Sequence, residues 1–414
     1  SVNEIAGSNC QLVYEGEDPL LESNGMWKTK QIARINKGKF QGEPFNASSD
    51  GFTVEIWYRP LGAGGYAGNS GSQNGTIIST GVGYWDGWRI TTYPRNNSIL
   101  FEIGRPNPMN SVNTGSANGP ILGVWNHIAA TWDRKTMRLF VNGLQVSEAP
   151  YSGDYYPPVS DKIFRVGYAG WGVGSVDMDV DMAALYGKPL TSKQIFEHAC
   201  MSDNISDDTY KMLTDAESEF KSNQYSKALS MYKKAKKTPE IAAIIDLRIA
   251  QCLLNAGKTR DSFIILNKLV NNKSVQDWIR ITAAKSVIRG LQSTTASESF
   301  IKSALGMAGL NDNEKKQLKI SLARSFKSKG DKQGAGRVMN EMIKDAVNSN
   351  DYETILQFAR TCAQSGDYQS AIHYYETAAA VKDAPVYVKC YSALCKARLY
   401  VNMKKYKNAL EIYK

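Results

Sequence analysis

Three aspartates near residue 180 have a spacing that could support chemistry. Asp177, Asp179 and Asp181 alternate with methionine and valine, and alternate side chains of a strand share one face at about 7 Å spacing. Converging carboxylates can bind calcium, and a carboxylate pair about 5–10 Å apart can hydrolyse a glycosidic bond. The simpler interpretation is a polar strand face opposite a core face made by Met178 and its neighbours. The metal prediction is therefore none, with calcium left open.

Aromatic residues in glycine-rich segments form a second candidate site. One segment contains Tyr84, Trp85, Trp88 and Arg89, and a later one places Trp171 between two glycines. Aromatic rings on loops can stack against sugar rings, because the flat aromatic face is apolar while the loop around it supplies polar groups. We predict a ligand-binding site at these five residues. Packing of the same rings inside the domain is the alternative, since aromatic side chains bury large areas.

Other reactive constellations are missing from the sequence. The three histidines (127, 198, 373) are far apart, and the six cysteines have no zinc-ligand spacing. No Ser/His/Asp set and no phosphate-binding glycine loop is present, so no catalytic residue is predicted. Cys10 and Cys200 bracket the first half and form a candidate disulfide. Cys252, Cys362, Cys390 and Cys395 are expected to be buried in helices as small apolar residues.

The elements that would carry these residues change character near residue 200. Seven of the eight tryptophans and 26 of the 34 glycines precede residue 201. The first 200 residues have 16 Lys/Arg against 18 Asp/Glu, and the remaining 214 have 34 against 22. We therefore predict two domains, at 1–200 and 209–414, joined by a hinge at 201–208. The basic second half has two interpretations: it binds an acidic partner, or its lysines only keep the outer helix faces solvated. Nucleic acid is not favoured as the partner, because no aromatic residues alternate with the lysines in a stacking pattern.

Short alternating strands dominate the first domain. The segment from Phe52 to Tyr58 places Phe52, Val54, Ile56 and Tyr58 on one face, and six further runs follow the same style. Asn142-Gly143 is a strong signal for a hairpin turn of the primed type. Trp57, Trp125 and Trp132 lie in strand-like segments and are expected in the core. Many short antiparallel strands over this length predict a sandwich or jelly roll.

Specific motifs make this domain resemble a known family. The run Trp125-Asn-His-Ile-Ala-Ala-Thr-Trp-Asp133, followed by Leu-Phe-Val-Asn-Gly143, resembles the signature of laminin-G-like jelly rolls of the concanavalin A-like superfamily. Phe52 to Trp57 resembles its early strand, and residues 180–195 resemble its closing strand and short helix, where Thr191 is expected to cap and Gln194 to reach back. The resemblance covers about residues 10–198. It departs where Met182 and Ala184 replace an acid and an arginine.

The resemblance implies a binding module for glycans or proteins, often secreted and sometimes calcium-dependent. Related glucanases carry an E-x-D-x-x-E triplet, which does not occur here. The resemblance therefore implies recognition rather than hydrolysis.

The second domain repeats a helical pattern. Small residues at positions 228, 262, 335, 371 and 409 are spaced by 34, 73, 36 and 38 residues, with aromatics at fixed offsets. The gap of 73 predicts a degenerate unit around Trp278–Ala304. The pattern resembles tetratricopeptide repeats, which implies about six helix pairs, the last truncated, in an all-α right-handed superhelix that docks a peptide or protein.

Three functions are compatible with this organisation. The favoured one is a non-enzymatic exported scaffold, whose sandwich binds a glycan or extracellular protein while the repeats dock a protein partner. The alternatives are a polysaccharide-active enzyme or its accessory subunit, and an intracellular scaffold for acidic partners. No apolar run is long enough to span a membrane. The chain starts without methionine and stops inside a repeat, so we expect the natural protein to continue at both ends.

Overall fold

A computed structural model describes most of the chain. The described residues are 13–15, 21–22, 32–35, 39–42, 50–62, 75–80, 86–93, 97–106, 109–115, 117–157, 164–167, 176–202, 205–235, 239–290, 297–364 and 366–414. They divide into two compact units. The first comprises Ser1–Val287 with Gly306–Leu310, and the second comprises Ile288–Leu305 with Asn311–Lys414. Independent folding of residues 1–200 stays a prediction.

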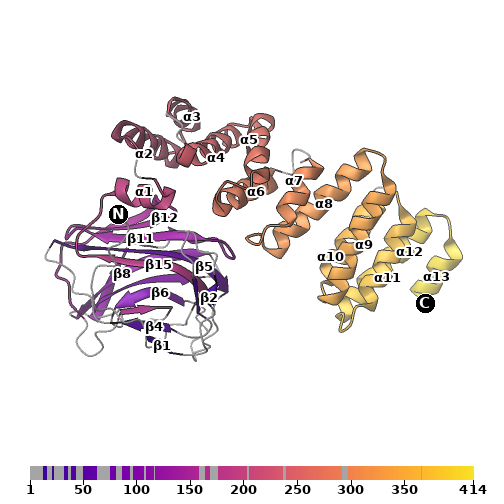
Figure 1. Ribbon diagram of the computed structural model, residues 1–414. Coiled ribbons are helices and arrows are strands. Elements are labelled where there is room, and N and C mark those ends of the chain that lie inside the picture. The colour runs from indigo at the N-terminus through magenta and orange to yellow at the C-terminus, as the bar shows by residue number, and fades with distance from the viewer. Residues whose placement is uncertain are drawn as a thin grey trace. The chain divides into compact units, whose positions relative to one another are not determined.

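The N-terminal region is a sandwich of two antiparallel sheets (Figure 1). One sheet has the order β1 (Val13–Glu15), β4 (Lys39–Gly42), β14 (Phe164–Val166), β6 (Gly75–Thr80), β7 (Trp88–Tyr93), β8 (Ser98–Pro106) and β10 (Ala117–Asn118), with β9 (Met109–Asn113) also paired to β8. The other has the order β13 (Leu144–Pro150), β12 (Thr136–Val141), β11 (Asn126–Trp132), β5 (Phe52–Gly62), β15 (Asp177–Tyr186), β3 (Ile32–Ile35) and β2 (Leu21–Glu22).

The core between the sheets follows the alternation seen in the sequence. Phe52, Val54, Ile56 and Tyr58 of β5 are all fully buried in it, as predicted. The turn from β12 to β13 is also as predicted, because Asn142 and the following glycine both have positive φ, at 51° and 77°. The primed turns need this geometry, which matches the twist of the flanking strands.

A short helix, α1 (Ser192–Cys200), covers the outer face of the second sheet. Its Ile195 packs with Ala129 of β11 and Phe140 of β12. The predicted capping box is present: Thr191 accepts a hydrogen bond from the Gln194 backbone, while the Gln194 side chain accepts one from the Thr191 backbone. The helix thus turns an outward sheet face into a second, smaller core.

Helices continue to the end of the chain (Figure 1). They are α2 (Asp207–Lys221), α3 (Tyr225–Lys234), α4 (Pro239–Asn255), α5 (Thr259–Asn271), α6 (Asp277–Gly290), α7 (Glu298–Leu305), α8 (Asp312–Ser328), α9 (Lys332–Asn348), α10 (Tyr352–Gln364), α11 (Tyr368–Ala380), α12 (Val386–Asn402) and α13 (Tyr406–Tyr413). None of the described helices is long and apolar enough to cross a bilayer.

Neighbouring helices pack in pairs: α2 with α3, α4 with α5, α8 with α9, α10 with α11, and α12 with α13. The predicted small residues Ala228, Ala371 and Ala409 are buried in these pairs. One border between the compact units, at residues 287 and 288, falls within the stretch 278–304 where the sequence repeat is degenerate. The prediction for Cys390 was wrong: it is exposed, because α12 directs Val388 and Ser392 inward instead.

A turn at 306–310 belongs to the first unit although it lies far along the chain. The sandwich segment before β11 packs closely on it: a Cβ at Gly123 would lie 3.3 Å from the Ala308 Cβ. A Cβ at Gly309 would lie 2.9 Å from Ile121 Cγ2 and 2.5 Å from Ile281 Cδ1. A Cβ at Gly309 would therefore force its neighbours to shift, whereas one at Gly123 would only make the contact tighter than usual.

Candidate ligand-binding surface of the sandwich

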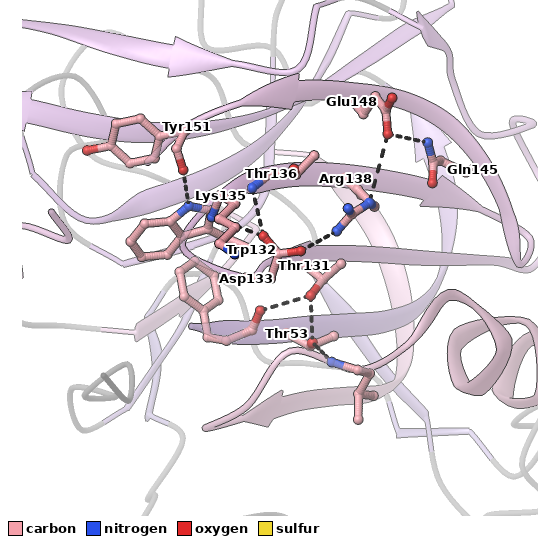
Figure 2. Close-up of polar contacts among 12 residues, drawn as sticks. Thr53, Thr131, Trp132, Asp133, Lys135, Thr136, Arg138, Gln145, Glu148 and Tyr151 are labelled. Atoms are coloured by element: carbon pink, nitrogen blue, oxygen red, sulfur yellow. Dashed lines mark hydrogen bonds and ion pairs between the residues drawn. The ribbon is translucent and has the colours of Figure 1, made fainter. Parts of the chain in front are cut away.

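The turn between β11 and β12 is built around a buried tryptophan (Figure 2). Trp132 is fully buried, and its Nε1 donates a 2.8 Å hydrogen bond to the Tyr151 carbonyl oxygen. The two rings stack with centroids 5.4 Å apart. A tryptophan that satisfies its single donor in this way is a rigid base for the residues around it.

Asp133 fixes the turn that follows. Its Oδ1 accepts hydrogen bonds from the backbone N–H groups of Lys135 at 3.0 Å and Thr136 at 2.7 Å, and its Oδ2 accepts one from Arg138 at 2.7 Å. Although partial burial raises the pKa of Asp133, these bonds hold it below the ordinary value. Arg134 has a positive φ of 68° at the tip. Its guanidinium lies over the Trp132 ring at 5.0 Å.

The segment after β13 returns to the same place. The Tyr151 hydroxyl donates a 2.6 Å hydrogen bond to the Asp154 carbonyl, and the Asp154 carboxylate lies 3.4 Å from Arg134 Nη2. The Tyr156 carbonyl accepts a 2.7 Å bond from Gly87 N, while the Tyr156 side chain is 37 % exposed. These contacts join three loops of the sandwich and leave one aromatic ring partly open to solvent.

Two arginines, Arg105 and Arg134, act electrostatically on the Tyr151 hydroxyl. Burial raises the pKa of Tyr151, with Tyr156 and Asp154 acting in the same direction and Arg105 and Arg134 acting against them. The Nε of Arg105 is buried and has no hydrogen-bond partner among the described residues. We call Arg105, Arg134, Tyr151, Asp154 and Tyr156 the rim cluster.

The predicted aromatic site is only partly described. Trp88 is fully buried, with its ring 5.6 Å from Phe52, and Arg89 is 1 % exposed and paired with Glu102 at 2.5 Å. Both therefore have packing positions in the sandwich, where neither side chain faces solvent. Adjacent residues of a strand point to opposite faces, and residues 88–92 of β7 are all buried, so both faces of this strand are covered.

Tyr84, Trp85 and Trp171 lie outside the described residues, so their role stays a prediction. Asp86, which follows Trp85 directly, packs against Gly104: a Cβ on that glycine would lie 2.4 Å from Asp86 N. Gly104 in turn precedes Arg105 of the rim cluster. The described end of the predicted aromatic segment is thus beside the rim cluster.

The three aspartates of β15 do not all lie on one face of the strand, although the sequence alternation had predicted this. Asp179 is fully buried, and its Oδ2 accepts a 2.8 Å hydrogen bond from Arg59 Nε. The register shifts between Val180 and Met182, where Asp181 forms a β-bulge. Because a bulge inserts one extra residue, the alternation changes phase there. Ala183 then packs on the core in place of Met182.

The calcium and disulfide predictions both stay predictions. Within the described residues, no group of three or more His, Cys, Asp or Glu side chains is arranged to hold a metal ion. Calcium binding therefore stays untested for the remaining residues. Cys200 is buried at the end of α1. Cys10 lies outside the described residues, so their disulfide also stays a prediction.

A cluster of polar side chains lies between the second sheet and α1. Glu55, fully buried, is 2.8 Å from His198 Nδ1 of α1, 3.2 Å from the Tyr186 hydroxyl and 3.8 Å from His127 Nε2. Burial lowers the pKa of His127 to about 4, with Glu55 raising it and His198 lowering it. The group fastens α1 to the sheet and is closed to large ligands.

Sequence reasoning missed the rim cluster. The available signals were a four-residue hairpin at Asp133 to Thr136 and three tyrosines at 151, 155 and 156. Neither signal shows that Gly87 lies beside Tyr156, because that contact joins residues distant in the sequence. Trp57 and Trp132 are buried as predicted, whereas Trp125 is half-buried beneath Arg59, whose Cζ is 5.2 Å from the ring.

Comparisons with known proteins place the sandwich in a family of folds. Residues 36–196 match the sequence model of the laminin G-like family described as "Concanavalin A-like lectin/glucanases superfamily". No curated protein matches the chain.

Similar solved structures are receptor-binding parts of neurotoxins. One is the botulinum neurotoxin serotype D ligand binding domain in complex with N-acetylneuraminic acid, at 14 % identity and TM-score 0.36, with 47 % of this chain and 46 % of that chain covered. Another is the serotype G binding domain, at 15 % identity, TM-score 0.36 and 47 % coverage of each chain. The chain thus spans about half the length of these structures. With the family match, the described strands identify residues 36–196 as a concanavalin A-like domain, which is followed by a helical region.

Proposed function

We propose that this protein is an exported, non-catalytic binding protein whose sandwich recognises a glycan through the rim cluster, while its helices dock a protein partner. The rim cluster supports the first part. It combines a partly exposed ring at Tyr156 with a carboxylate at Asp154 and guanidinium groups at Arg105 and Arg134. Sugar recognition needs this mixture, because rings stack on the apolar face of a sugar while charged groups hydrogen-bond its hydroxyls.

The single observation that carries the glycan proposal is that the two arginines of the rim cluster are weakly engaged by other groups of the protein. Arg134 is 36 % exposed and holds Asp154 only at 3.4 Å, and Asp154 is 76 % exposed. The buried Arg105 Nε lacks a partner among the described residues. Donors that are positioned but weakly engaged are free to bind a ligand. Two arginines against one aspartate favour a sugar that carries a carboxylate or sulfate.

The pairing of buried carboxylates favours binding over hydrolysis. Glu102 lies against Arg89, Asp179 against Arg59, and Glu55 against His198. Glycoside hydrolysis requires two carboxyl groups that flank one bond, one of them protonated. A carboxylate bound by its own basic neighbour is poorly placed to flank a glycosidic bond as that acid.

A groove in the second unit supports docking by the helices. It has a volume of about 460 Å³ and lies at α8, α9 and the start of α10, with Lys315, Lys316 and Lys319 on one side and Asp345 and Asp351 on the other. A groove with positive charges on one side and negative charges on the other suits a polar peptide rather than a small apolar molecule.

The test is a glycan array probed with the full chain, with and without calcium. We expect binding to be enriched among acidic glycans, and Arg134→Ala and Tyr156→Ala each to weaken it at least about tenfold, the range for an interface contact of about 1.4 kcal/mol. Arg138→Ala is the matched control, because Arg138 is on the same hairpin but outside the rim cluster. Equal loss in the control, or release of reducing sugar by the purified protein, would contradict the proposal.

A further inference from the structure

A pocket of about 300 Å³ lies between α11 and α12, two helices that pack side by side (Figure 1). Three small residues, Ala379, Ala380 and Ala393, form part of its wall, and Ser392 lines it as well. We call this space the α11–α12 pocket. Its volume is at the lower end of the range for ligand pockets, so only a small molecule fits.

The serine in this pocket is unusual for a helical residue. Ser392 is 1 % exposed, and its Oγ has no hydrogen-bond partner among the described residues. A buried serine inside a helix commonly donates to the carbonyl oxygen four residues earlier. Other helical hydroxyls of the chain do so, among them those of Thr282, Ser286, Thr361 and Thr377. A buried hydroxyl without a partner is costly, so Ser392 has an unused donor at the pocket.

The preceding helix pair has an equivalent hydroxyl with partners. Counted back from the ends of α10 and α12, Thr354 is the equivalent of Ser392. The buried Thr354 hydroxyl donates a hydrogen bond to the Asp351 carboxylate and accepts one from the Lys316 ammonium group. At the position equivalent to Asp351, α12 has Lys389. The later hydroxyl thus has a cation at the position where the earlier one has its carboxylate.

The charged residues that line the pocket leave one positive charge unpaired. Lys396 Nζ donates a 2.7 Å hydrogen bond to Glu376 Oε1, so this pair is neutral. Lys389 is exposed and forms no ion pair with another described residue. It precedes Ser392 by three positions, which places both on one side of α12. One carboxylate from outside the protein would accept the Ser392 hydrogen bond and pair with Lys389.

The pocket is formed by α11 and α12 and does not involve the exposed face of α12. At about 100° per residue, Leu394 lies about 200° around the helix from Ser392. Leu394 and Val401, which are 50 % and 42 % exposed, are therefore on the far side of α12 from the pocket. Whatever covers that face leaves the pocket in place.

We propose that the α11–α12 pocket binds a small organic monocarboxylate, with the carboxylate at Ser392 and Lys389 and a short apolar body against the alanines. A dry cavity of about 150 Å³ holds benzene, so a pocket of about 300 Å³ accommodates an acid of the size of benzoate. This site lies outside both the rim cluster and the groove at α8 to α10. It therefore adds a small-molecule site to the proposed binding of a glycan and a protein.

The test is an NMR titration in which the full chain is added to benzoate, to butanoate or to benzamide. Benzamide has the shape of benzoate but no charge. We expect benzoate to bind at least about tenfold more tightly than benzamide, and its binding to weaken as salt increases. A capped Gly-Glu-Gly tripeptide carries the same carboxylate on a protein side chain. It should bind at least about tenfold more weakly than benzoate, because the pocket has little room for a peptide backbone.

Variants of the full chain locate the site. Ser392→Ala and Lys389→Gln should each weaken benzoate binding at least about tenfold, since each removes one contact to the carboxylate. The matched controls are Ser286→Ala, a buried helical serine on α6, and Lys382→Gln, an exposed lysine before α12. Both controls should bind benzoate like the unmodified chain.

Thermal unfolding gives a second readout of the serine. Because the Ser392 hydroxyl has no partner in the described protein, Ser392→Ala should leave the unfolding temperature unchanged or raise it. Ser286→Ala breaks a 2.8 Å hydrogen bond to the Thr282 carbonyl oxygen and should give the lower temperature of the two. The opposite ranking would show that the Ser392 hydroxyl serves the fold, which overturns its assignment to a ligand.

Each remaining outcome also overturns the proposal. Equal binding of benzamide and benzoate would show that the carboxylate is not recognised. Binding that ignores both pocket variants would place the acid elsewhere, and absence of binding by both benzoate and butanoate would exclude the pocket as an acid site. Tighter binding of the tripeptide would make the pocket part of the docking surface, which preserves the proposed function and rejects a free acid. Glycan binding by the sandwich is measured separately and is independent of these results.

Discussion

The sandwich and the second helical unit treat charged side chains in opposite ways. The sandwich buries Arg89 with Glu102, and it buries Asp179, Glu55 and His127 completely. In the described part of the second unit, the buried polar side chains are the hydroxyl residues Ser321, Ser325, Thr354 and Ser392. Some strands, such as β7, are covered on both faces, so their polar residues need partners inside the protein. A helix at the surface keeps a wide solvent-facing side on which charges remain hydrated.

This difference shows which contacts specify the structure of each region. A buried ion pair forms only in one strand register, because Arg89 and Glu102 are direct cross-strand partners. The sandwich is thus defined by contacts that occur once. The helix pairs are defined by contacts that recur, such as those of the buried small residues Ala371 and Ala409, which lie at equivalent positions of two pairs.

The largest expected effect would break a contact of the first kind. Trp132→Ala removes a fully buried ring that contacts Phe52 and Tyr151. We expect the free energy of unfolding of the sandwich to fall by about 3–5 kcal/mol, the range for large core truncations. Tyr413→Ala, at an exposed repeat position, should change stability by less than about 0.5 kcal/mol. Urea unfolding of both variants tests the contrast, and similar losses would refute it.

A pH titration would sharpen the same comparison. Burial holds the pKa of His127 at about 4, below its unfolded value of about 6.5. The unfolded chain therefore binds the proton more readily, and the stability from neutral His127 is complete above pH 6.5 and lost as pH falls towards 4. The expected loss over this window is about 3 kcal/mol.

The measurement is the slope of unfolding free energy against pH between 6.5 and 4. His127→Gln should flatten this slope, whatever its effect on stability at neutral pH. His373→Gln is the control, because His373 is exposed on α11. An unchanged slope in His127→Gln would show that the histidine is not buried neutral.

Two glycines with the same backbone angle test packing alone. Gly143 and Gly257 have φ of 77° and 76°. A Cβ at Gly143 would lie 2.8 Å from the Ala199 Cβ on α1, whereas a Cβ at Gly257 meets nothing within 4 Å. Both alanine variants pay the left-handed strain, and Gly143→Ala should cost about 1–3 kcal/mol more because of overpacking. Thermal unfolding that ranks the two variants equally would argue against tight packing of α1.

The smallest effect concerns a half-exposed ion pair. Asp133→Asn keeps the acceptor for Lys135 and Thr136 but removes the charge opposite Arg138, whose side chain is 28 % exposed. We expect a loss below about 1 kcal/mol, since solvent screens such pairs. Asp133→Ala also removes the turn hydrogen bonds and should lose more. The two variants together measure how much of the turn depends on charge.

Local patterns allowed much of the fold to be predicted. The alternation from Phe52 to Tyr58, the turn at Asn142-Gly143 and the capping box at Thr191 each depend on neighbours within a few residues. The candidate site depended on contacts between distant segments. Trp88 looked like a loop aromatic because glycines precede it, although its strand is covered on both faces, and Arg89 found its partner thirteen positions away on the next strand. The bulge at Asp181 likewise has no local signal.

The packing of residues 306–310 on the sandwich segment 121–123 has a consequence for biosynthesis. A chain emerges from the ribosome N-terminus first, and domains generally fold as units. The first unit contains Gly306–Leu310, but residues 288–305 belong to the second. The contact between the sandwich and residues 306–310 therefore cannot form until Leu310 has been synthesised, although the last strand of the sandwich ends at Tyr186. Until then, the surface around Gly123 remains exposed in the nascent chain, and a ribosome stalled before this point would hold an unfinished unit.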